Sequence, residues 1–221
     1  GNQALNVNTT GDRNVAVGAN ALDANTTGRR SVAVGYESLT DNTEGEFNTA
    51  VGYRSLENNT SADHNAAFGY QALGANTTGT SNVAIGSLAL DSNTTASDNT
   101  AVGANSLGAN TTASNNSAFG NKALKSNTTG GSNTACGDQS LEANTTGVAN
   151  AAFGAEALEA STTGNYLTAV GQGALHANTT ASSNTAVGYN ALNDNTTGFG
   201  NSAVGDRALS KTTTGNYNTG L

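Results

Sequence analysis

The chain of 221 residues contains no proline, no methionine and no tryptophan, one cysteine, and only 11% charged residues. A single cysteine cannot form an internal disulfide, which excludes a disulfide-stapled fold. Disordered chains usually combine low hydrophobicity with high charge and abundant proline, and this chain has neither. No apolar run approaches the roughly 20 residues that span a bilayer, so we expect no membrane insertion.

Basic residues are also few. The chain has 8 Lys and Arg against 16 Asp and Glu, a formal net charge of −8, and the signs are scattered along it. Without a basic patch there is no electrostatic footprint for nucleic acid, so we expect no nucleic-acid partner.

What the chain does have is repetition. The glycine of an Ala-Val-Gly phrase recurs every 17 residues from Gly18 to Gly205, and one further step back reaches Gly1. The length of 221 residues equals 13 × 17. We therefore predict a single repeat array over residues 1–221, thirteen coils long and without separate caps. Positions within a coil are numbered 1 to 17 from this glycine.

Several positions of the repeat are nearly constant. Position 5 is always Leu, position 9 always Thr, position 4 always Ala or Ser, and position 16 is Ala in every coil but the last. Position 17 is always apolar, with Val, Phe or Ile in most coils and Cys136 in one. Positions 2, 3, 6, 7, 12 and 13 vary and carry nearly all the charge. We infer that structure holds the constant positions.

The spacing favours strands over helices. Apolar residues gather at positions 15–17 and 4–5, which does not fit the i, i+3, i+4, i+7 pattern of a helix. Antiparallel hairpins are also disfavoured, because the chain contains no Asn-Gly or Asp-Gly. We predict an all-β parallel solenoid, or β-roll, with strands at positions 14–17 and 2–5 and a kink at the glycine. Equal positions would then stack about 4.8 Å apart.

Position 8 and position 14 are each Asn in eleven of the thirteen coils. Asn tolerates left-handed backbone angles at turns, and stacked Asn or Thr side chains form ladders. Neighbouring strand residues point to opposite faces, and positions 16 and 17 are both constrained, as are positions 4 and 5. We therefore expect both faces of these strands to be buried, one in the lumen and one against another copy of the chain, in a side-by-side oligomer and specifically a trimer.

The segment NTAVGYNALNDNTTG, residues 184–198, resembles two known repeat classes. Its first half is similar to the head repeats of trimeric autotransporter adhesins, and the whole segment is similar to the NTAVGYxAL and NTTG arrays of phage tail-fibre-type proteins. The resemblance covers essentially the whole chain. It implies a left-handed parallel β-roll that is commonly trimeric.

The two ends of the array suggest a second mode of assembly. The last four residues, NTGL, followed by the first five of another copy, GNQAL, read as one more repeat phrase. The sequence therefore predicts head-to-tail stacking into a filament, since a heterologous contact that does not close makes fibres. The residues expected at this contact are Gly1, Ala4, Leu5, Thr219, Gly220 and Leu221.

Residues with catalytic or ligand chemistry do not form a repeated pattern. His64 and His176 fall at different positions of the repeat, and we expect each to be a solvated variant of a free position. Cys136 stands at an apolar position and is expected to be a small core residue. Carboxylates have no repeating partner. We expect no enzyme, no cofactor and no metal site.

Two weaker patterns concern surface chemistry. The Asn-x-Ser/Thr glycosylation pattern recurs at ten turn positions, and turn Asn is the competing interpretation. These Asn are Asn8, Asn25, Asn59, Asn76, Asn93, Asn110, Asn127, Asn144, Asn178 and Asn195. The Thr pair at positions 9 and 10 resembles the Thr arrays of ice-binding solenoids. Those arrays lie on one face, however, and adjacent residues point to opposite sides of a strand.

These observations predict a structural protein: a rigid extracellular fibre segment, on a cell-surface appendage or a virion, built from stacked β-coils. The alternative is an adhesin or receptor-binding module that binds cell-surface glycan through the Tyr and charged residues of positions 2 and 3. Ice binding is a lesser alternative.

Overall fold

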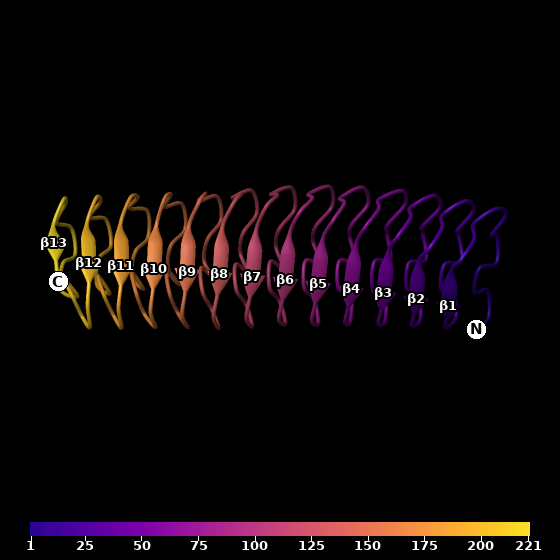
Figure 1. Cartoon of the computed structure of the whole chain (residues 1–221), viewed down its shortest axis with the longest axis horizontal. Helices are drawn as coiled ribbons and strands as arrows, with labels where there is room; N and C mark the ends of the chain where they lie inside the picture. The colour runs from indigo at the N-terminus through magenta and orange to yellow at the C-terminus, as the bar shows by residue number, and fades with distance from the viewer. The chain divides into compact units, whose positions relative to one another are not determined.

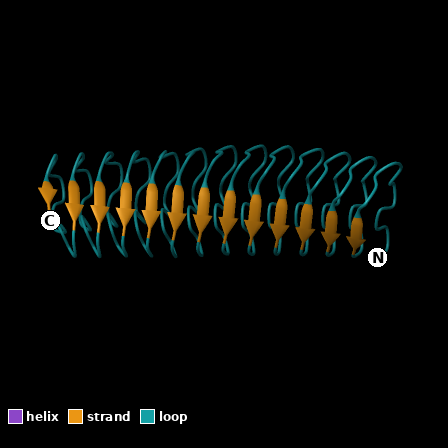
Figure 2. Cartoon of the chain, viewed as in Figure 1, coloured by secondary structure: helices purple, strands orange, loops and turns teal.

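The computed structural model describes all 221 residues and contains short parallel strands, turns and no helix (Figure 2). The chain divides into two compact units, Gly1–Thr112 and Ala113–Leu221. Unit 1 contains β1 (Val15–Val17), β2 (Val32–Val34), β3 (Thr49–Val51), β4 (Ala66–Phe68), β5 (Val83–Ile85) and β6 (Thr100–Val102). Unit 2 contains β7 (Ser117–Phe119), β8 (Thr134–Cys136), β9 (Ala151–Phe153), β10 (Thr168–Val170), β11 (Thr185–Val187), β12 (Ser202–Val204) and β13 (Thr219–Gly220).

Within each unit every strand pairs in parallel with the strand of the next coil (Figure 1). The register is a shift of one repeat: Ala16 lies opposite Ala33, and Ala135 lies opposite Ala152. Equal positions of the repeat therefore stack on one another in columns. The expectation of an all-β parallel solenoid with a 17-residue coil is confirmed.

The second predicted strand, at positions 2–5, is wrong, because these residues form turns. In coil 5 the residues at positions 3 and 5, Gln71 and Leu73, adopt left-handed backbone angles with φ of 50° and 55°. Alternating left-handed residues cannot continue a pleated strand, since a β-strand keeps φ negative throughout. Apolar content alone did not distinguish this tight bend from an extended segment.

Hydrogen bonds between coils nevertheless continue around these turns. The N–H of Leu73 donates to the carbonyl oxygen of Ala89 in the next coil (2.9 Å), and the N–H of Leu88 donates back to Tyr70 (2.9 Å). Farther along the coil, the N–H of Thr77 donates to the carbonyl oxygen of Thr94 (2.9 Å). Each coil is thus tied to the next at several points of its perimeter, although only three of its 17 residues are strand.

The constant glycine is required by a close approach of two coils. Gly86 has φ of 134°, and a Cβ on it would lie 2.6 Å from the carbonyl oxygen of Gly103. An L side chain is strained at this backbone angle and would collide with a backbone atom. Glycine at position 1 therefore lets the chain leave the strand and turn while neighbouring coils stay at strand spacing.

The core of each unit is a set of small, repeated columns. Leu at position 5 has no exposed surface from Leu22 to Leu192, and the Ala side chains of position 16 are likewise buried from Ala33 to Ala203. Each Leu pays roughly 1–2 kcal/mol for its left-handed backbone. Burial of its side chain contributes about 1.5–3 kcal/mol, which offsets that cost and explains why Leu is tolerated there.

Two columns of buried asparagine complete the interior. In the position-8 column, Asn42 Nδ2 donates to Asn25 Oδ1 of the previous coil (2.9 Å) and to the carbonyl oxygen of Gly45 (3.0 Å). In the position-14 column, Asn65 Nδ2 donates to the carbonyl oxygen of Gly79 (2.9 Å), and its Oδ1 accepts from the N–H of Asn82 (3.0 Å). The predicted Asn ladder is present, and it satisfies backbone groups that the turns leave without strand partners.

Candidate functional site

The surface that distinguishes this solenoid is the outward side of its sheet, here called the outer sheet face and defined as the residues at positions 15 and 17. The Ala at position 16 points into the lumen, so its two strand neighbours must point outward. Position 17 holds Val, Phe, Ile, Cys or Leu, and position 15 holds Val, Thr, Ala or Ser.

Most side chains of position 17 are open to solvent, and the others are half-buried. In unit 1, Val17 is 55% exposed and Ile85 41%, and in unit 2, Phe119 is 42% exposed and Phe153 44%. In the single chain this second face is therefore open, and its burial against another copy stays a prediction. Positions 4 and 5 are both buried within a coil because the left-handed turn at position 5 directs both side chains inward.

Cys136 belongs to the outer sheet face as well. Its thiol is free and exposed, so its predicted role as a small core residue is wrong. Position 17 is apolar without being internal, and hydrophobic identity alone does not reveal on which side of a three-residue strand a column lies.

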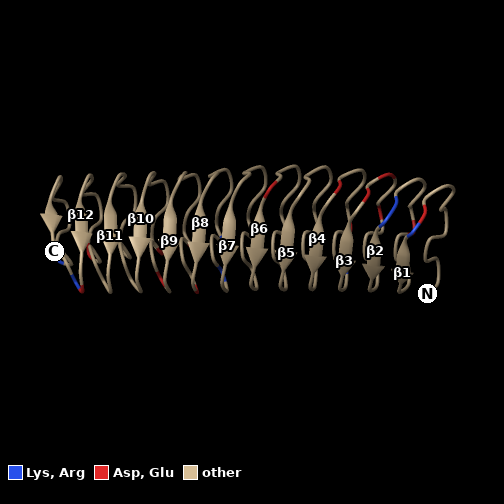
Figure 3. Ribbon diagram, viewed as in Figure 1, with Lys and Arg blue, Asp and Glu red and all other residues tan.

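The outer sheet face carries no charged residue in any coil. Figure 3 shows the same pattern: the strands are tan, and the acidic and basic residues lie on the turns and connecting segments. In a chain of net charge −8, this leaves one continuous neutral, partly apolar surface in each unit. Contiguous apolar surface of this kind marks interaction sites on soluble proteins.

A stack of tyrosines borders this face in unit 1. The rings of Tyr36 and Tyr53 stack with centroids 5.4 Å apart, and those of Tyr53 and Tyr70 with centroids 5.5 Å apart. In this stack the ring faces contact one another, so a ligand would meet mostly the edges of the rings. This geometry does not favour stacking of a sugar on the tyrosines, and glycan binding stays a prediction of the sequence.

Charged residues of position 3 pair with each other beside this stack, and one of them contacts a tyrosine ring. Arg54 Nε lies 2.7 Å from Glu37 Oε2 and 3.6 Å from Glu57 Oε1, and its guanidinium covers the Tyr53 ring. Partial burial acts to raise the pKa of Glu37, but hydrogen bonds from Tyr36 and Arg54 outweigh it and lower the pKa. In coils 3 and 4, the predicted binding residues of positions 2 and 3 are therefore engaged with each other.

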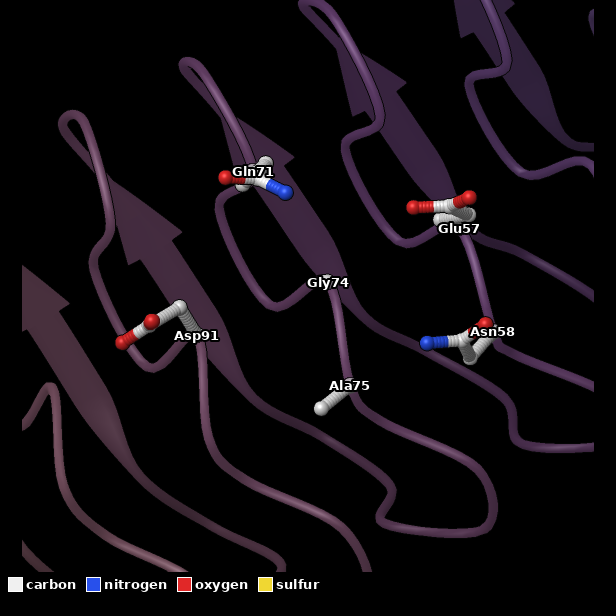
Figure 4. A pocket seen from close by; sticks show the side chains of 6 residues that line it. All are labelled: Glu57, Asn58, Gln71, Gly74, Ala75 and Asp91. Atoms are coloured by element: carbon white, nitrogen blue, oxygen red, sulfur yellow. The ribbon is translucent and has the colours of Figure 1, made fainter.

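A small polar pocket of about 170 Å³ lies beside this network, at positions 6 and 7 of the coils (Figure 4). Gly74 has no side chain, and the gap that it leaves is flanked by Glu57 and Asp91 from the coils on either side. Gln71 also lines it. The pocket contains carboxylates and amides but neither a nucleophile nor an imidazole, and we assign no reaction to it.

Both carboxyl groups of the pocket have raised pKa values. Burial raises the pKa of Asp91, against hydrogen bonds from its own N–H and that of Ser92. Burial also raises the pKa of Glu57, partly offset by the Arg54 guanidinium. Each carboxylate therefore costs some stability when it is charged.

The structure places nine of the ten predicted glycan acceptors inside the solenoid. Only Asn8 is exposed, whereas the other nine have no accessible surface. Most of their side-chain amides donate to a neighbouring coil, as Asn76 Nδ2 does to Asn59 Oδ1 (3.1 Å). A glycan on a buried amide would break these bonds, so the folded interior favours the turn interpretation of this pattern.

The threonine pair of positions 9 and 10 is divided between two roles. Position-9 hydroxyls donate to the next coil, as Thr77 Oγ1 does to the carbonyl oxygen of Thr94 (3.1 Å). Position-10 side chains such as Thr78 are exposed. The two columns therefore do not form one flat face of free hydroxyls, and ice binding stays a prediction.

The residues expected at the end-to-end contact lie in the first and last coils. Gly1 is exposed, Ala4 and Leu5 are half-buried, Thr219 is exposed, and Leu221 is 98% exposed.

The two histidines have separate surroundings. His64 is exposed and its ring stacks on Phe47 with centroids 4.8 Å apart. His176 lies 2.9 Å from a carboxylate oxygen of Glu159. His176 is thus half-buried and paired, rather than simply solvated.

Comparison with known proteins gives no further assignment. No protein-family model, no curated protein and no solved structure matches the chain. The structure has no helix long and apolar enough to cross a membrane.

Proposed function

We propose that the chain is a structural segment of an extracellular fibre, in which solenoids associate side by side through their outer sheet faces. The observation that carries this proposal is the column at position 17, which is apolar in all thirteen coils and yet faces outward. A column exposed to water throughout its function would have no physical reason to remain apolar in every coil.

A second copy of the chain is the partner that fits this face. The side chains of position 17 recur at strand spacing, about 4.8 Å. A partner with the same axial repeat can therefore place one side chain against each of them. Two negatively charged copies repel each other elsewhere, but the outer sheet face is free of charge. The mechanism is mechanical: stacked coils give stiffness, and lateral contact between copies gives thickness.

The oligomeric state of the purified chain tests this proposal. Sedimentation of wild type is expected to show an oligomer, and Phe153→Glu, which places a charge on the outer sheet face, is expected to weaken association at least about tenfold. Thr163→Glu is the matched control, because Thr163 is exposed in the next coil at position 10, which does not belong to that face. A wild-type chain that stays monomeric at about 100 μM, well above the micromolar Kd of weak specific pairs, would contradict lateral association.

Cys136 provides a direct probe of the interface without any substitution. If outer sheet faces meet with coil 8 of one copy against coil 8 of the other, mild oxidation will link Cys136 of two copies, since a disulfide needs Cα atoms about 4.4–6.8 Å apart. Moving the thiol to exposed position 10 with Thr129→Cys/Cys136→Ser should abolish the link. Equal cross-linking of the two proteins would indicate random collision and count against the interface. The number of copies, predicted to be three, is read from the same sedimentation data.

End-on stacking through the first and last coils is a separate proposal. Electron microscopy of the purified chain distinguishes it from lateral association, because it lengthens particles without thickening them. Particles that do not lengthen with concentration would exclude it and leave the lateral interface untouched.

A further inference from the structure

Three side chains with metal-ligating atoms meet on the surface of unit 2. They are Glu156 and Glu159 of coil 10 and His176 of coil 11, and one ligand atom from each lies within 4.8 Å of the others. All three residues are half-buried. The imidazole Nε2 of His176 is already 2.9 Å from Glu159 Oε2.

The repeat itself creates this cluster. Glu159 and His176 both occupy position 6, so they stack in one column at strand spacing. Glu156 occupies position 3 of the same coil as Glu159, and a turn hydrogen bond from the N–H of Glu159 to the carbonyl oxygen of Glu156 (3.4 Å) brings the two close together. Two of the ligands are therefore fixed by one turn and the third by the stacking of coils.

The charge around the cluster is unbalanced toward the negative. The neighbouring acid of the column, Glu142, is occupied by Lys125 (Nζ to Oε1, 3.7 Å) and by Gln139 (Nε2 to Oε2, 2.9 Å). Glu156 and Glu159 have no such lysine or arginine, and the structure pairs only His176 with Glu159. Two carboxylates thus face one imidazole, an arrangement that gains from an added cation.

The cluster also opens onto a hollow. A pocket of about 440 Å³ is lined by Glu159 and His176 together with Glu142, Gln139 and Ser126. It leaves room beside the ligands for water molecules on a bound ion.

We propose that Glu156, Glu159 and His176 form a binding site for Zn²⁺ that staples coil 10 to coil 11. An imidazole with two carboxylates is a ligand set that suits zinc, and the imidazole disfavours Mg²⁺ and Ca²⁺. Zinc bonds of about 2.0–2.2 Å require the ligand atoms to approach by roughly 1 Å. The flexible glutamate side chains can supply this movement, and water completes the coordination.

The position of the site has a structural meaning. Coil 10 is the one coil in which both Asn columns are interrupted, by Ser161 at position 8 and Leu167 at position 14. Asn144 Oδ1, which faces this interruption from coil 9, has no hydrogen-bond donor. A metal staple at coils 10 and 11 would therefore add a bond between coils where the asparagine ladders supply fewer.

Calorimetric titration with zinc chloride tests the proposal, with Cys136→Ser in every protein so that no thiolate competes. We expect one zinc per chain, and a loss of affinity of roughly tenfold or more in His176→Asn and in Glu159→Gln. The matched controls are His64→Asn, which removes the other histidine, and Asp206→Asn, which removes an exposed acid of unit 2 that lines neither the cluster nor its hollow. Both should bind zinc with wild-type stoichiometry.

Two further readouts separate a specific site from attraction to an acidic surface. Zinc should raise the unfolding temperature of wild type and leave that of His176→Asn unchanged, and Co²⁺ should give the visible absorption bands of a nitrogen- and oxygen-ligated ion only when His176 is present. Absence of saturable zinc binding would overturn the proposal, and so would equal losses in His64→Asn and His176→Asn. Neither readout depends on association between copies.

Discussion

Asn93 Nδ2 donates to Asn76 Oδ1 at 2.9 Å, and both side chains are completely buried. The bond joins equal positions of successive coils, and the same amide also donates to the carbonyl oxygen of Ala96 within its own coil (3.0 Å). Each asparagine thus links two coils and closes a turn. This relationship explains why a polar residue is kept in the interior of so small a fold.

Replacing one rung of this ladder should be costly. Asn76→Ala leaves Asn59 Oδ1 without its donor and Asn93 Nδ2 without one of its two acceptors in a buried setting. We expect a loss of about 3 kcal/mol in the free energy of unfolding of unit 1, measured by urea denaturation. Asn58→Ala, at an exposed asparagine, is the control and should change stability by less than about 0.5 kcal/mol. Similar effects of the two substitutions would contradict the ladder's role.

The close approach at the position-1 glycine predicts that two Gly→Ala substitutions will differ in their effect on stability. Gly86→Ala forces a side chain onto a backbone with φ of 134° and into contact with Gly103, so it should destabilise unit 1 by about 2 kcal/mol or more. Gly108→Ala meets only contacts of 3.4 Å and longer at an ordinary backbone angle. It should be neutral or slightly stabilising. Thermal unfolding of the two variants checks the difference, and the reverse order would show that the close approach is not limiting.

Coil 10 predicts a coupled pair of substitutions. Leu167 Cδ1 lies against Gly164. In the preceding coil, the side-chain amide of the position-14 Asn takes the corresponding place. Ser161 is short enough to leave room for the Leu167 side chain. Ser161→Asn alone should therefore collide with Leu167. Ser161→Asn/Leu167→Asn should restore both ladders and stabilise unit 2 by about 1–2 kcal/mol.

A double-mutant cycle checks this coupling, with amide hydrogen exchange in coils 9–11 as the local readout. Strictly additive single effects would show that the two residues do not share space.

The half-buried carboxyl of Asp91 predicts a pH-dependent effect. Its pKa in the folded chain is raised above the ordinary 3.8, so its protonated form is favoured by folding, and this stabilisation is lost as pH rises through the raised pKa. Asp91→Asn should therefore be more stable than wild type at pH 7, by about 0.5 kcal/mol. The advantage should disappear below about pH 3.8.

Denaturation curves at several pH values measure this effect. Asp98→Asn removes the same charge from an exposed position and reports the contribution of net charge alone. An Asp91→Asn advantage that persists at low pH would point to a cause other than ionisation.

Much of the fold could be predicted from the chain alone. The unbroken 17-residue period, the constant Gly and Leu, and the two Asn columns led to a parallel solenoid whose coils stack in register, because residues that repeat without insertion can only stack on their equivalents. The strand predicted at positions 14–17 is present at positions 15–17, and the ladder of Asn42 on Asn25 was anticipated.

The direction of each side chain was decided only by the tertiary structure. Left-handed backbone angles at positions 3 and 5 turn an expected second strand into a bend, and this brings Leu73 inside with its neighbour Ala72. Position 17, equally apolar in sequence, is left outside with Phe153 and Cys136. Composition and period cannot separate these cases, because the side on which a side chain falls depends on φ and ψ and not on hydrophobicity. The meeting of Glu156, Glu159 and His176 has the same origin: the period stacks Glu159 and His176, but only the folded turn brings Glu156 beside them.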